Sequence, residues 1–422
     1  MGALRRRGHR VAPFKVGPDY IDPGYHSLAA ERPGRNLDPV LVGEELVGPM
    51  YARGAAGSDI AVVEGVMGLF DGRIGSGQGS TAQVAKLLGL PVVMVVDVRG
   101  HSQSLAALLH GFATFDSGVQ LAGVILNRVG SERHEDVLRD ACEQAGLPVL
   151  GAVPRIAQLN VPSRHLGLIP AVEHGTAAVQ AVDAMADVVG SHVDLDAVLG
   201  AARPAKSFDP LAWERSESNA RIAIAGGPVF TFGYAEHREM LEAFGAEVVT
   251  FDPLVDGLPD GTTGLVLPGG FPEQHAAALA DNRGLLAQIR AAAAAGMPIH
   301  AECAGLLYLC KSLDSVPMTG VLDAEATFSE MLTLGYRDAV AVADSALWKT
   351  GDRVRGHEFH RSVVTPRAGR AAWGFAGGPE GFVDGNVHAS FLHTHPVAHP
   401  GAVREFVARA SPVRFSACLR TS

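Results

Sequence analysis

The sequence has little cysteine and no long hydrophobic run. Its four cysteines, Cys142, Cys303, Cys310 and Cys418, form no CxxC pair. This spacing excludes a zinc ribbon or a disulfide framework and predicts reduced thiols. No apolar run reaches the roughly 18 residues of a membrane span, and the basic start, MGALRRRGHRVAPF, is not followed by the apolar core of a secretory signal. These absences predict a soluble, cytoplasmic protein.

Lysine is also scarce, since it supplies only five of the 35 basic residues. The 45 acidic residues give a net charge of −10, so a broad basic surface is not expected and nucleic acid is not expected to be the main partner. Hydrophobic residues make up 47% of the 422 residues and charged residues 19%. This composition is typical of a globular protein with room for two or three domains.

The chain divides into two stretches in which strand and helix patterns alternate. In the first, short β-branched apolar runs end in a polar residue, Gly or Pro, as in DIAVVEG, LPVVMVVDV, VQLAGVILN and GLPVLGAVP. Such runs predict buried parallel strands of an α/β sheet. The pattern lapses over 201–220 and restarts with RIAIAGG, AEVVTFDP, TGLVLPGG and MPIHAECA. We predict an α/β domain over 1–200, a linker over 201–220 and a second α/β domain over 221–422.

Three carboxylates in the first half follow predicted strands or the loops after them: Glu64, Asp71 and Asp97. Ligands of open α/β sheets bind outside the carboxyl ends of the strands, and a carboxylate placed there can hold Mg²⁺ in nucleotide-binding folds. For any one of these residues taken alone, a helix cap or a loop turn is the better explanation. The pattern therefore favours a nucleotide site without identifying which carboxylate forms it.

A dense polar loop follows the predicted strand RVAPF. The segment FKVGPDYIDPGYH places Lys15, Asp19, Tyr20, Asp22 and His26 in a stretch shaped by Pro and Gly. Such a loop is costly to order without a ligand. We predict that these side chains bind substrate.

Two further segments carry weaker signals. Asn127 and Arg128 end the strand GVILN, where a base or a phosphate could be bound, although capping explains them equally well. Arg164 and His165 lie in the turn NVPSRHLGL, which a solvated loop would also explain.

The stretch PIHAECAGLLYL places Cys303 between a predicted strand and a predicted helix. A nucleophile on a sharp strand-to-helix turn needs small neighbours, and Ala301, Ala304 and Gly305 are small. The start of a helix would also stabilise a thiolate. A buried, inert cysteine is the alternative, and Cys310 in the same predicted helix illustrates it.

A cysteine nucleophile also requires a base and donors for the oxyanion. LPGGFPE supplies backbone N–H groups at Gly269 and Gly270, and ASFLHTHP supplies His393 as the candidate base. His357 and His360 in GHEFHRS are rival bases, but their spacing is not the HExxH of a zinc protease.

Taken in order, these motifs resemble one family. KVGPDYIDPGYH, VVEGVMGLFDG, RHLGL, LPGGFPE, AECAGLLYL, GHEFHRS and SFLHTH are similar to segments of the cobyrinic and hydrogenobyrinic acid a,c-diamide synthases of cobalamin biosynthesis. The resemblance implies two doubly wound α/β domains: a P-loop domain like that of dethiobiotin synthetase and a flavodoxin-like class I glutamine amidotransferase domain. It implies a carbon–nitrogen ligase that uses ATP, Mg²⁺ and glutamine to amidate the a and c acetates of a corrinoid through an acyl phosphate.

The resemblance also assigns roles to residues. Cys303 matches the glutaminase nucleophile and His393 the histidine that activates it. Typical class I amidotransferases have a Glu two positions after that histidine, where this chain has His395. The group that orients His393 must therefore come from elsewhere.

In the first domain, Asp19, Asp22 and Asp71 match acidic positions of the synthetase site, and Glu64 matches the Mg²⁺ carboxylate. The family begins with a strand and a phosphate loop ending in GKT or GKS, whereas this sequence contains no GxxxxGK[ST]. This difference predicts a missing central strand, an incomplete ATP cradle and an in-frame phosphate loop encoded upstream.

Other functions remain open at this stage. A nickel-sirohydrochlorin a,c-diamide synthase would resemble the chain closely, and a cobyric acid synthase less so, because DYIDPGYH belongs to the a,c branch. A hydrolase using only Cys303 and His393, or a homologue without catalytic activity, would also fit the residues.

Overall fold

The computed structural model describes residues 1–156, 163–164 and 167–411. The chain forms two compact units, Met1–Leu211 and Ala212–Ser422. Two residues named above, His165 and Cys418, lie outside the described residues. Within the described ranges, no helix has both the length and the apolar character needed to cross a bilayer.

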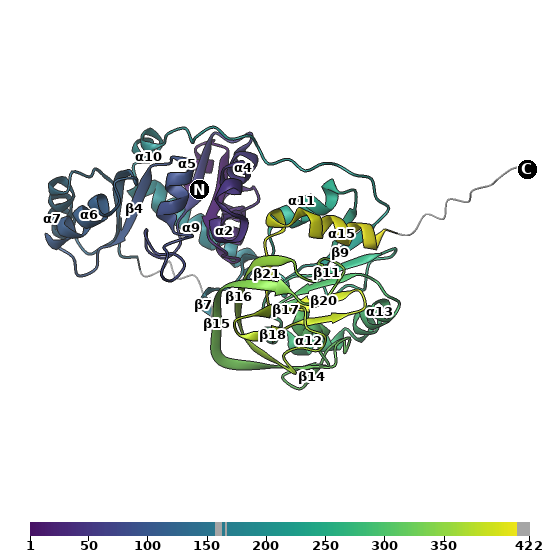
Figure 1. Ribbon diagram of the computed structural model, residues 1–422. Helices are drawn as coiled ribbons and strands as arrows, with labels where there is room; N and C mark the ends of the chain where they lie inside the picture. Colours follow the sequence, from purple (N-terminus) through teal and green to yellow (C-terminus); the bar gives the residue numbers. More distant parts are fainter. Residues whose placement is uncertain (157–162, 165–166, 412–422) are drawn as a thin grey trace, which may run out of the picture. The chain divides into compact units, whose positions relative to one another are not determined.

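The first unit contains two parallel sheets of three strands each, in the orders β2-β1-β3 and β4-β5-β6. Their strands, with the short pair β7 and β8, are β1 (Val11–Val16), β2 (Arg35–Leu37), β3 (Ile60–Glu64), β4 (Val92–Asp97), β5 (Leu121–Val129), β6 (Val149–Pro154), β7 (Ser163–Arg164) and β8 (Gly167–Leu168). The helices are α1 (Gly2–Arg6), α2 (Asp22–Ala30), α3 (Pro39–Val42), α4 (Glu44–Ala55), α5 (Thr81–Leu88), α6 (Ser104–Phe115), α7 (Glu132–Gln144), α8 (Ala171–His174), α9 (Thr176–His192) and α10 (Leu195–Ala201). Figure 1 shows α6 and α7 beside β4.

Apolar side chains hold these layers together. Leu105 of α6 and Leu138 of α7 pack on Val124 of β5 in one cluster. A second cluster combines Ile60 of β3 with Ile125 of β5, so it draws on both sheets. Each of the strands predicted in this half is present and parallel.

The prediction that all these strands are buried is wrong for β3 and β4. Residues of β3 are half-buried or exposed, and Val95 of β4 is 63% exposed. Each of these two strands ends its sheet and hydrogen-bonds to a strand on one side only among the described residues. Apolar composition alone does not distinguish such an edge from a central strand.

The second unit contains a six-stranded sheet in the order β10-β9-β11-β12-β20-β19, parallel except for β19. Its strands are β9 (Arg221–Ala225), β10 (Glu247–Phe251), β11 (Gly264–Leu267), β12 (Ile299–Glu302), β19 (Phe382–Asp384) and β20 (Val387–Ser390). A seven-stranded sheet comprises β13 (Ser312–Leu313), β14 (Val316–Pro317), β15 (Glu325–Ala341), β16 (Arg353–Thr365), β17 (Trp373–Phe375), β18 (Gly378–Glu380) and β21 (His393–Thr394). The α/β fold class is confirmed in both units.

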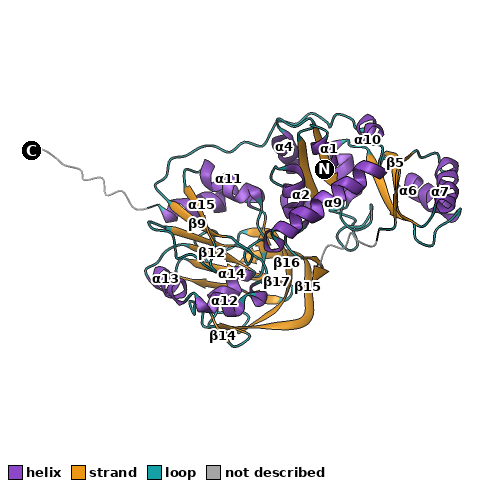
Figure 2. Ribbon diagram, turned by 180° about the vertical axis from the view of Figure 1, so that it is seen from behind, coloured by secondary structure: helices purple, strands orange, loops and turns teal. Residues whose placement is uncertain are grey.

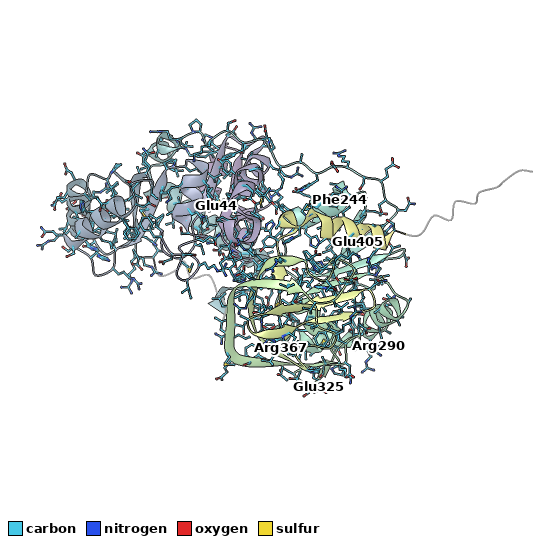
Figure 3. All side chains as sticks on the ribbon, in the orientation of Figure 1. Glu44, Phe244, Arg290, Glu325, Arg367 and Glu405 are labelled. Carbon is cyan, nitrogen blue, oxygen red and sulfur yellow. The ribbon has the colours of Figure 1, made fainter. Side chains whose placement is uncertain are left out.

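Helices cover both faces of the six-stranded sheet (Figure 2). They are α11 (Ala235–Ala243), α12 (Ala276–Asp281), α13 (Arg283–Ala294), α14 (Ala304–Leu309) and α15 (Pro400–Ala410), with short 3-10 turns η1 (Pro272–Gln274) and η2 (Pro396–Ala398). Strand residues alternate between the faces. Leu265 packs in the core with α12, α13 and α14, whereas His300 faces Phe406 of α15. At the end of α11, Phe244 (Figure 3) lies under Arg404, whose guanidinium is 4.9 Å from its ring centroid.

Glu380 is a buried carboxylate that joins β18 to the segment after β20. It accepts hydrogen bonds from Ser390 Oγ at 2.6 Å and Phe391 N at 2.9 Å, and its side chain is only 1% exposed. Burial raises its pKa from 4.5 to about 7, although both hydrogen bonds act in the opposite direction. The folded protein therefore favours the protonated carboxyl more strongly than the unfolded chain does.

We expect Glu380→Gln to remove one component of the pH dependence of stability. Between pH 4.5 and about 7 the wild-type carboxyl is ionised mainly in the unfolded chain, so wild-type stability falls as pH rises through this range, by up to roughly 3 kcal/mol. Glutamine cannot ionise, so the free energy of unfolding of the variant relative to wild type should rise by up to the same roughly 3 kcal/mol between pH 4.5 and about 7. All three tryptophans, Trp213, Trp348 and Trp373, lie in the second unit, so urea unfolding followed by tryptophan fluorescence measures the effect there. A difference that does not vary with pH would contradict the assignment.

Candidate functional site

Cys303 occupies a strained turn between β12 and α14. Its backbone angles are φ 48° and ψ −100°, a conformation that costs a residue with a side chain about 1–3 kcal/mol. The turn is held by hydrogen bonds from Cys303 N to Ser390 O (2.8 Å) and from Gly305 N to Pro268 O (3.1 Å). A Cβ at Gly305 would lie 2.1 Å from Leu267 O. The close packing predicted around a strand-to-helix nucleophile is therefore present.

His393 lies on β21 and is fully buried beside Cys303. Burial by itself lowers the pKa of His393, but its hydrogen-bonding and charge interactions with Cys303 and Glu302 outweigh burial and raise the pKa to about 10. The imidazole is therefore positively charged at neutral pH. A protonated imidazole beside a cysteine is the arrangement that, in general, favours the nucleophilic thiolate form.

Glu302 is the last residue of β12 and directly precedes Cys303. Its Oε1 accepts hydrogen bonds from Thr394 N (3.1 Å) and Thr394 Oγ1 (3.0 Å) and lies 3.3 Å from His300 Nε2. Its Oε2 lies 3.5 Å from His393 Nδ1. Burial raises the pKa of Glu302, but His300 and His393 more than compensate, so the pKa is well below its ordinary value. The side chain is a carboxylate that faces the base.

Gly269 and Gly270 follow β11 at the same place. A Cβ at Gly269 would lie 2.4 Å from His393 Cε1, and one at Gly270 would lie 1.8 Å from Val229 O. Both positions therefore exclude a side chain. The backbone of Gly269 touches the edge of the His393 ring, as expected of a loop that lines the same site.

The rival bases have other contacts. His357 is paired in register with His393 across β16 and β21, and burial, followed by the charge of His393, lowers its pKa to about 3. His360 stacks on Phe391 with ring centroids 3.7 Å apart, and its Nδ1 lies 2.8 Å from Ser362 O. The geometry thus favours His393, the predicted base, over both.

The first unit brings together four of the predicted residues. Lys15 Nζ lies 2.6 Å from Asp22 Oδ2 and 3.2 Å from Glu64 Oε1, and it also donates to Gly65 O. His26 Nε2 contacts the other Glu64 oxygen. Lys15 is 5% exposed; burial lowers its pKa, but the carboxylates, Glu64 foremost, outweigh burial and raise it. Opposite charges from β1, α2 and β3 therefore meet at the ends of two parallel strands.

Glu64 keeps its charge in this cluster. Burial raises its pKa, but His26 and Lys15 outweigh that effect and lower it to about 2. Its side chain is 49% exposed, so part of the carboxylate remains available to a ligand. No group of three or more His, Cys, Asp or Glu in the described ranges is arranged to hold a metal ion.

Asp19 and Tyr20 lie deeper in the loop. Asp19 Oδ1 accepts hydrogen bonds from Ile21 N (2.8 Å) and Asp22 N (2.9 Å), and thus caps the start of α2. Burial and the nearby charge of Asp22 raise the pKa of Asp19. Tyr20 is 7% exposed. The part of the loop before α2 is therefore ordered by local contacts as well as by the Lys15 cluster.

The remaining predicted residues have separate contacts. Asp71 Oδ2 accepts from Gly68 N at 3.0 Å within its own exposed loop. Arg128, at φ 65°, donates to Asp97 Oδ2 at 2.9 Å, and Asn127 is paired with Asp97 across β5 and β4. Asp97, which also binds Arg99, is thus held at a strand end like Glu64.

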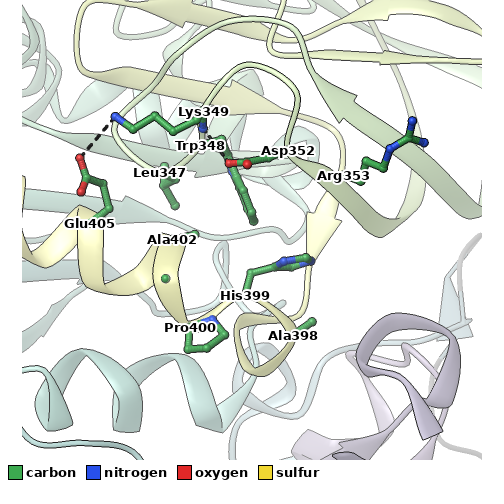
Figure 4. Close-up of a pocket in the computed structure, with 11 residues that line it drawn as sticks. Leu347, Trp348, Lys349, Asp352, Arg353, Ala398, His399, Pro400, Ala402 and Glu405 are labelled. Carbon is green, nitrogen blue, oxygen red and sulfur yellow. Dashed lines mark hydrogen bonds and ion pairs between the residues drawn. The ribbon is translucent and has the colours of Figure 1, made fainter. Parts of the chain in front are cut away.

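A pocket of about 470 Å³ lies elsewhere in the second unit, between the loop before β16 and the start of α15 (Figure 4). The pocket is lined by residues that include Trp348, Lys349 and His399. Lys349 Nζ lies 3.8 Å from Glu405 Oε1. None of the predicted site residues lines this pocket.

Comparisons with known proteins agree with both halves of the chain. Residues 1–169 match the CobQ/CobB/MinD/ParA nucleotide-binding domain, and residues 221–400 match the CobB/CobQ-like glutamine amidotransferase domain. The hydrogenobyrinate a,c-diamide synthase of Mycobacterium tuberculosis is 60% identical over 97% of this chain and 93% of its own length. The chain belongs to the cobyrinate and hydrogenobyrinate a,c-diamide synthase family.

Other members of this a,c-diamide synthase family are more distant. The hydrogenobyrinate enzyme of Streptomyces coelicolor is 53% identical over 97% of this chain and 93% of its own length. The cobyrinate a,c-diamide synthase of Gloeobacter violaceus is 42% identical over 98% and 93%, respectively. The resemblance inferred from the sequence motifs is therefore confirmed.

The sequence interpretation did not select Glu302, although that residue stands beside Cys303 in the quoted motif. The available signal was a carboxylate at the carboxyl end of a buried strand, the criterion that selected Glu64. The contact with His393 could not be deduced, because 90 residues lie between the two positions and the two residues belong to different sheets.

We expect Gly269→Ala to displace His393. The new methyl group would require His393 and Phe232 to move, and a displacement of about 1 Å can reduce a reaction rate by about 10²-fold. Alkylation of Cys303 by iodoacetamide at pH 7, measured by peptide mass spectrometry, should slow by at least about tenfold because a displaced imidazolium stabilises the thiolate less. Gly233→Ala is the matched control, since a Cβ there meets nothing within 4 Å. Equal rates in the two variants would contradict the contact.

Proposed function

We propose that this chain is a glutamine- and ATP-dependent a,c-diamide synthase that amidates the a and c acetate carboxylates of cobyrinic or hydrogenobyrinic acid in cobalamin biosynthesis. The observation that carries the proposal is Cys303, held at φ 48° in a tight turn that has no room for a Cβ at Gly305, and interacting with the buried His393. Its place in a chain of this family supports glutamine as the nitrogen donor.

The second unit would release ammonia from glutamine. Cys303 Sγ attacks the side-chain amide carbon, and the N–H groups of Gly269 and Gly270 form the oxyanion hole for the resulting negative oxygen. His393 gives a proton to the leaving nitrogen, so ammonia departs and a thioester remains. Water, deprotonated by His393, then attacks the thioester and releases glutamate and the thiolate.

The first unit would activate the substrate. A corrinoid carboxylate oxygen attacks the terminal phosphorus of ATP, which gives an acyl phosphate and ADP. Ammonia then attacks the acyl carbon, the bond from that carbon to the phosphate oxygen breaks, and amide, inorganic phosphate and a proton are released. Lys15 is the cation of the predicted site and is suited to hold a carboxylate or a phosphate.

The carboxylates of this unit would hold Mg²⁺ with the nucleotide. Mg²⁺ commonly takes one or two protein carboxylates together with water and phosphate oxygens, and Glu64 is ionised and half exposed. Asp22 lies on the other side of Lys15. We assign Asp19, Tyr20, His26 and Asp71 to the substrate site and Asn127 and Arg128 to the nucleotide.

We expect Cys303→Ser to lose glutamine-dependent amidation while retaining amidation driven by added ammonia. The serine hydroxyl is a much weaker nucleophile without the thiolate, so glutamine hydrolysis should fall by about 10³-fold or more. Cys310→Ser is the matched control: its thiol donates to Leu306 O inside α14, and burial raises its pKa to about 12, so it should keep wild-type hydrolysis. Unchanged hydrolysis in Cys303→Ser would refute the proposed nucleophile.

We expect Glu64→Gln to have the complementary effect. Loss of the charge should reduce ammonia-driven, ATP-dependent amidation by about 10²-fold or more and leave glutamine hydrolysis intact. Asp59→Asn, just before β3 and paired with Arg10, is the control and should behave as wild type. Product mass spectrometry measures the amides, and equal losses in both variants would contradict the role of Glu64.

A competing substrate is the nickel-sirohydrochlorin of a related a,c-diamide synthase. A direct comparison of initial amidation rates with hydrogenobyrinic acid, cobyrinic acid and nickel-sirohydrochlorin distinguishes them. We expect a corrinoid to be preferred, because the relatives compared above are named for hydrogenobyrinate and cobyrinate. A wild-type chain that neither hydrolysed glutamine nor turned over ATP would instead support a non-catalytic homologue.

A further inference from the structure

The position that would supply the third catalytic group, two residues after His393, holds His395. Its Nδ1 accepts a hydrogen bond from Val397 N at 3.3 Å at the start of η2, and its ring lies 4.1 Å from that of Tyr234, centroid to centroid. Burial lowers the pKa of His395 to about 3, so it is neutral at pH 7. It cannot provide a negative charge for His393.

Glu302 provides that charge from another element. Thr394 and His300 hold its Oε1 through three contacts of 3.0 to 3.3 Å, which leaves Oε2 directed at His393 Nδ1, 3.5 Å away. Nδ1 is therefore the ring nitrogen that faces the carboxylate, and Cys303 interacts with the same ring. This is the order of contacts in a nucleophile–histidine–acid triad.

Resting on the glutaminase activity proposed above, we propose that Glu302 is the positioning residue of the second unit: it orients His393 and stabilises the imidazolium, in place of an acid after the histidine. Because Glu302 directly precedes Cys303, the carboxylate and the thiol both lie at the end of β12. The base comes to them from β21, a strand of the other sheet.

The other titratable groups around this pair do not replace Glu302. His357 faces His393 from β16, and His300, His237 and His388 lie around Glu302 from β12, α11 and β20. Burial lowers the pKa of His237 to about 4 and those of His357 and His388 to about 3, so these rings are neutral at pH 7. Glu302 and Cys303 are therefore the two side chains whose interactions raise the pKa of His393.

The test measures the ionisation of Cys303 directly. In wild type and in Glu302→Gln, the rate of Cys303 alkylation by iodoacetamide is followed against pH by peptide mass spectrometry. Without the carboxylate, the imidazolium of His393 is less stable and therefore stabilises a thiolate less. The pH at which the alkylation rate reaches half its maximum should rise by about 1–3 pH units. For glutamine hydrolysis, kcat should fall by about 10²–10⁴-fold with little change in KM. Glu302→Asp keeps the charge and should recover part of both effects.

Glu358→Gln is the matched control. Glu358 is also a buried carboxylate of this unit, but its partners are Arg337 and His360, so its loss should lower thermal stability without moving the alkylation midpoint. Ammonia-driven amidation should persist in Glu302→Gln, and unchanged tryptophan fluorescence shows that the second unit, which holds all three tryptophans, is folded.

An unchanged midpoint in Glu302→Gln, or an equal shift in Glu358→Gln, would overturn the role of Glu302 while leaving the glutaminase intact. If instead wild-type protein hydrolyses no glutamine, the proposed function fails and the alkylation profile still decides whether Glu302 controls Cys303.

Discussion

The left-handed backbone at Cys303 is the constraint on which the rest of the second unit depends. A residue with a side chain adopts φ 48° and ψ −100° only when its surroundings over-determine it. Here β20 accepts the Cys303 N–H, and the loop after β11 accepts the Gly305 N–H. The same close approach requires glycine at 305, because Leu267 O would lie 2.1 Å from any Cβ. The backbone conformation of Cys303 therefore depends both on the tight turn itself and on the strands that lie beside β12 in the sheet.

The side chains proposed as acid and base come from different sheets. Glu302 and Cys303 leave the end of β12 in the six-stranded sheet, whereas His393 belongs to the sheet that contains β16. The three side chains meet only when both sheets have packed together. The interactions of His393 with Cys303 and Glu302 therefore exist only in the folded unit.

The sequence allowed prediction of what is encoded locally. Apolar runs located the strands, small residues marked the turn at Cys303, and the dense polar loop contains Lys15 and Asp22, which form an ion pair in the structure. What could not be predicted depends on distant pairing. The exposure of β3 and β4 follows from their places at sheet edges, and the contact of Glu302 with His393 follows from strand order. Asp19 was predicted to bind substrate, and the structure shows a local contact that the prediction did not include: its carboxylate accepts hydrogen bonds from the backbone at the start of α2.

His393 differs from the other buried histidines of the second unit in the direction of its pKa shift, because the neighbours of its ring are different. For His237, His357, His388 and His395, desolvation outweighs the charge of the nearby Glu302 or Glu358 and lowers the pKa. His393 is buried as deeply but lies against a thiol and a carboxylate, which reverse the sign of the shift. Lys15 follows the same rule in the first unit, where Glu64 and Asp22 preserve a charge that burial disfavours. In both units, interactions with neighbouring acidic groups, rather than exposure to water, favour the charged form of a buried basic side chain.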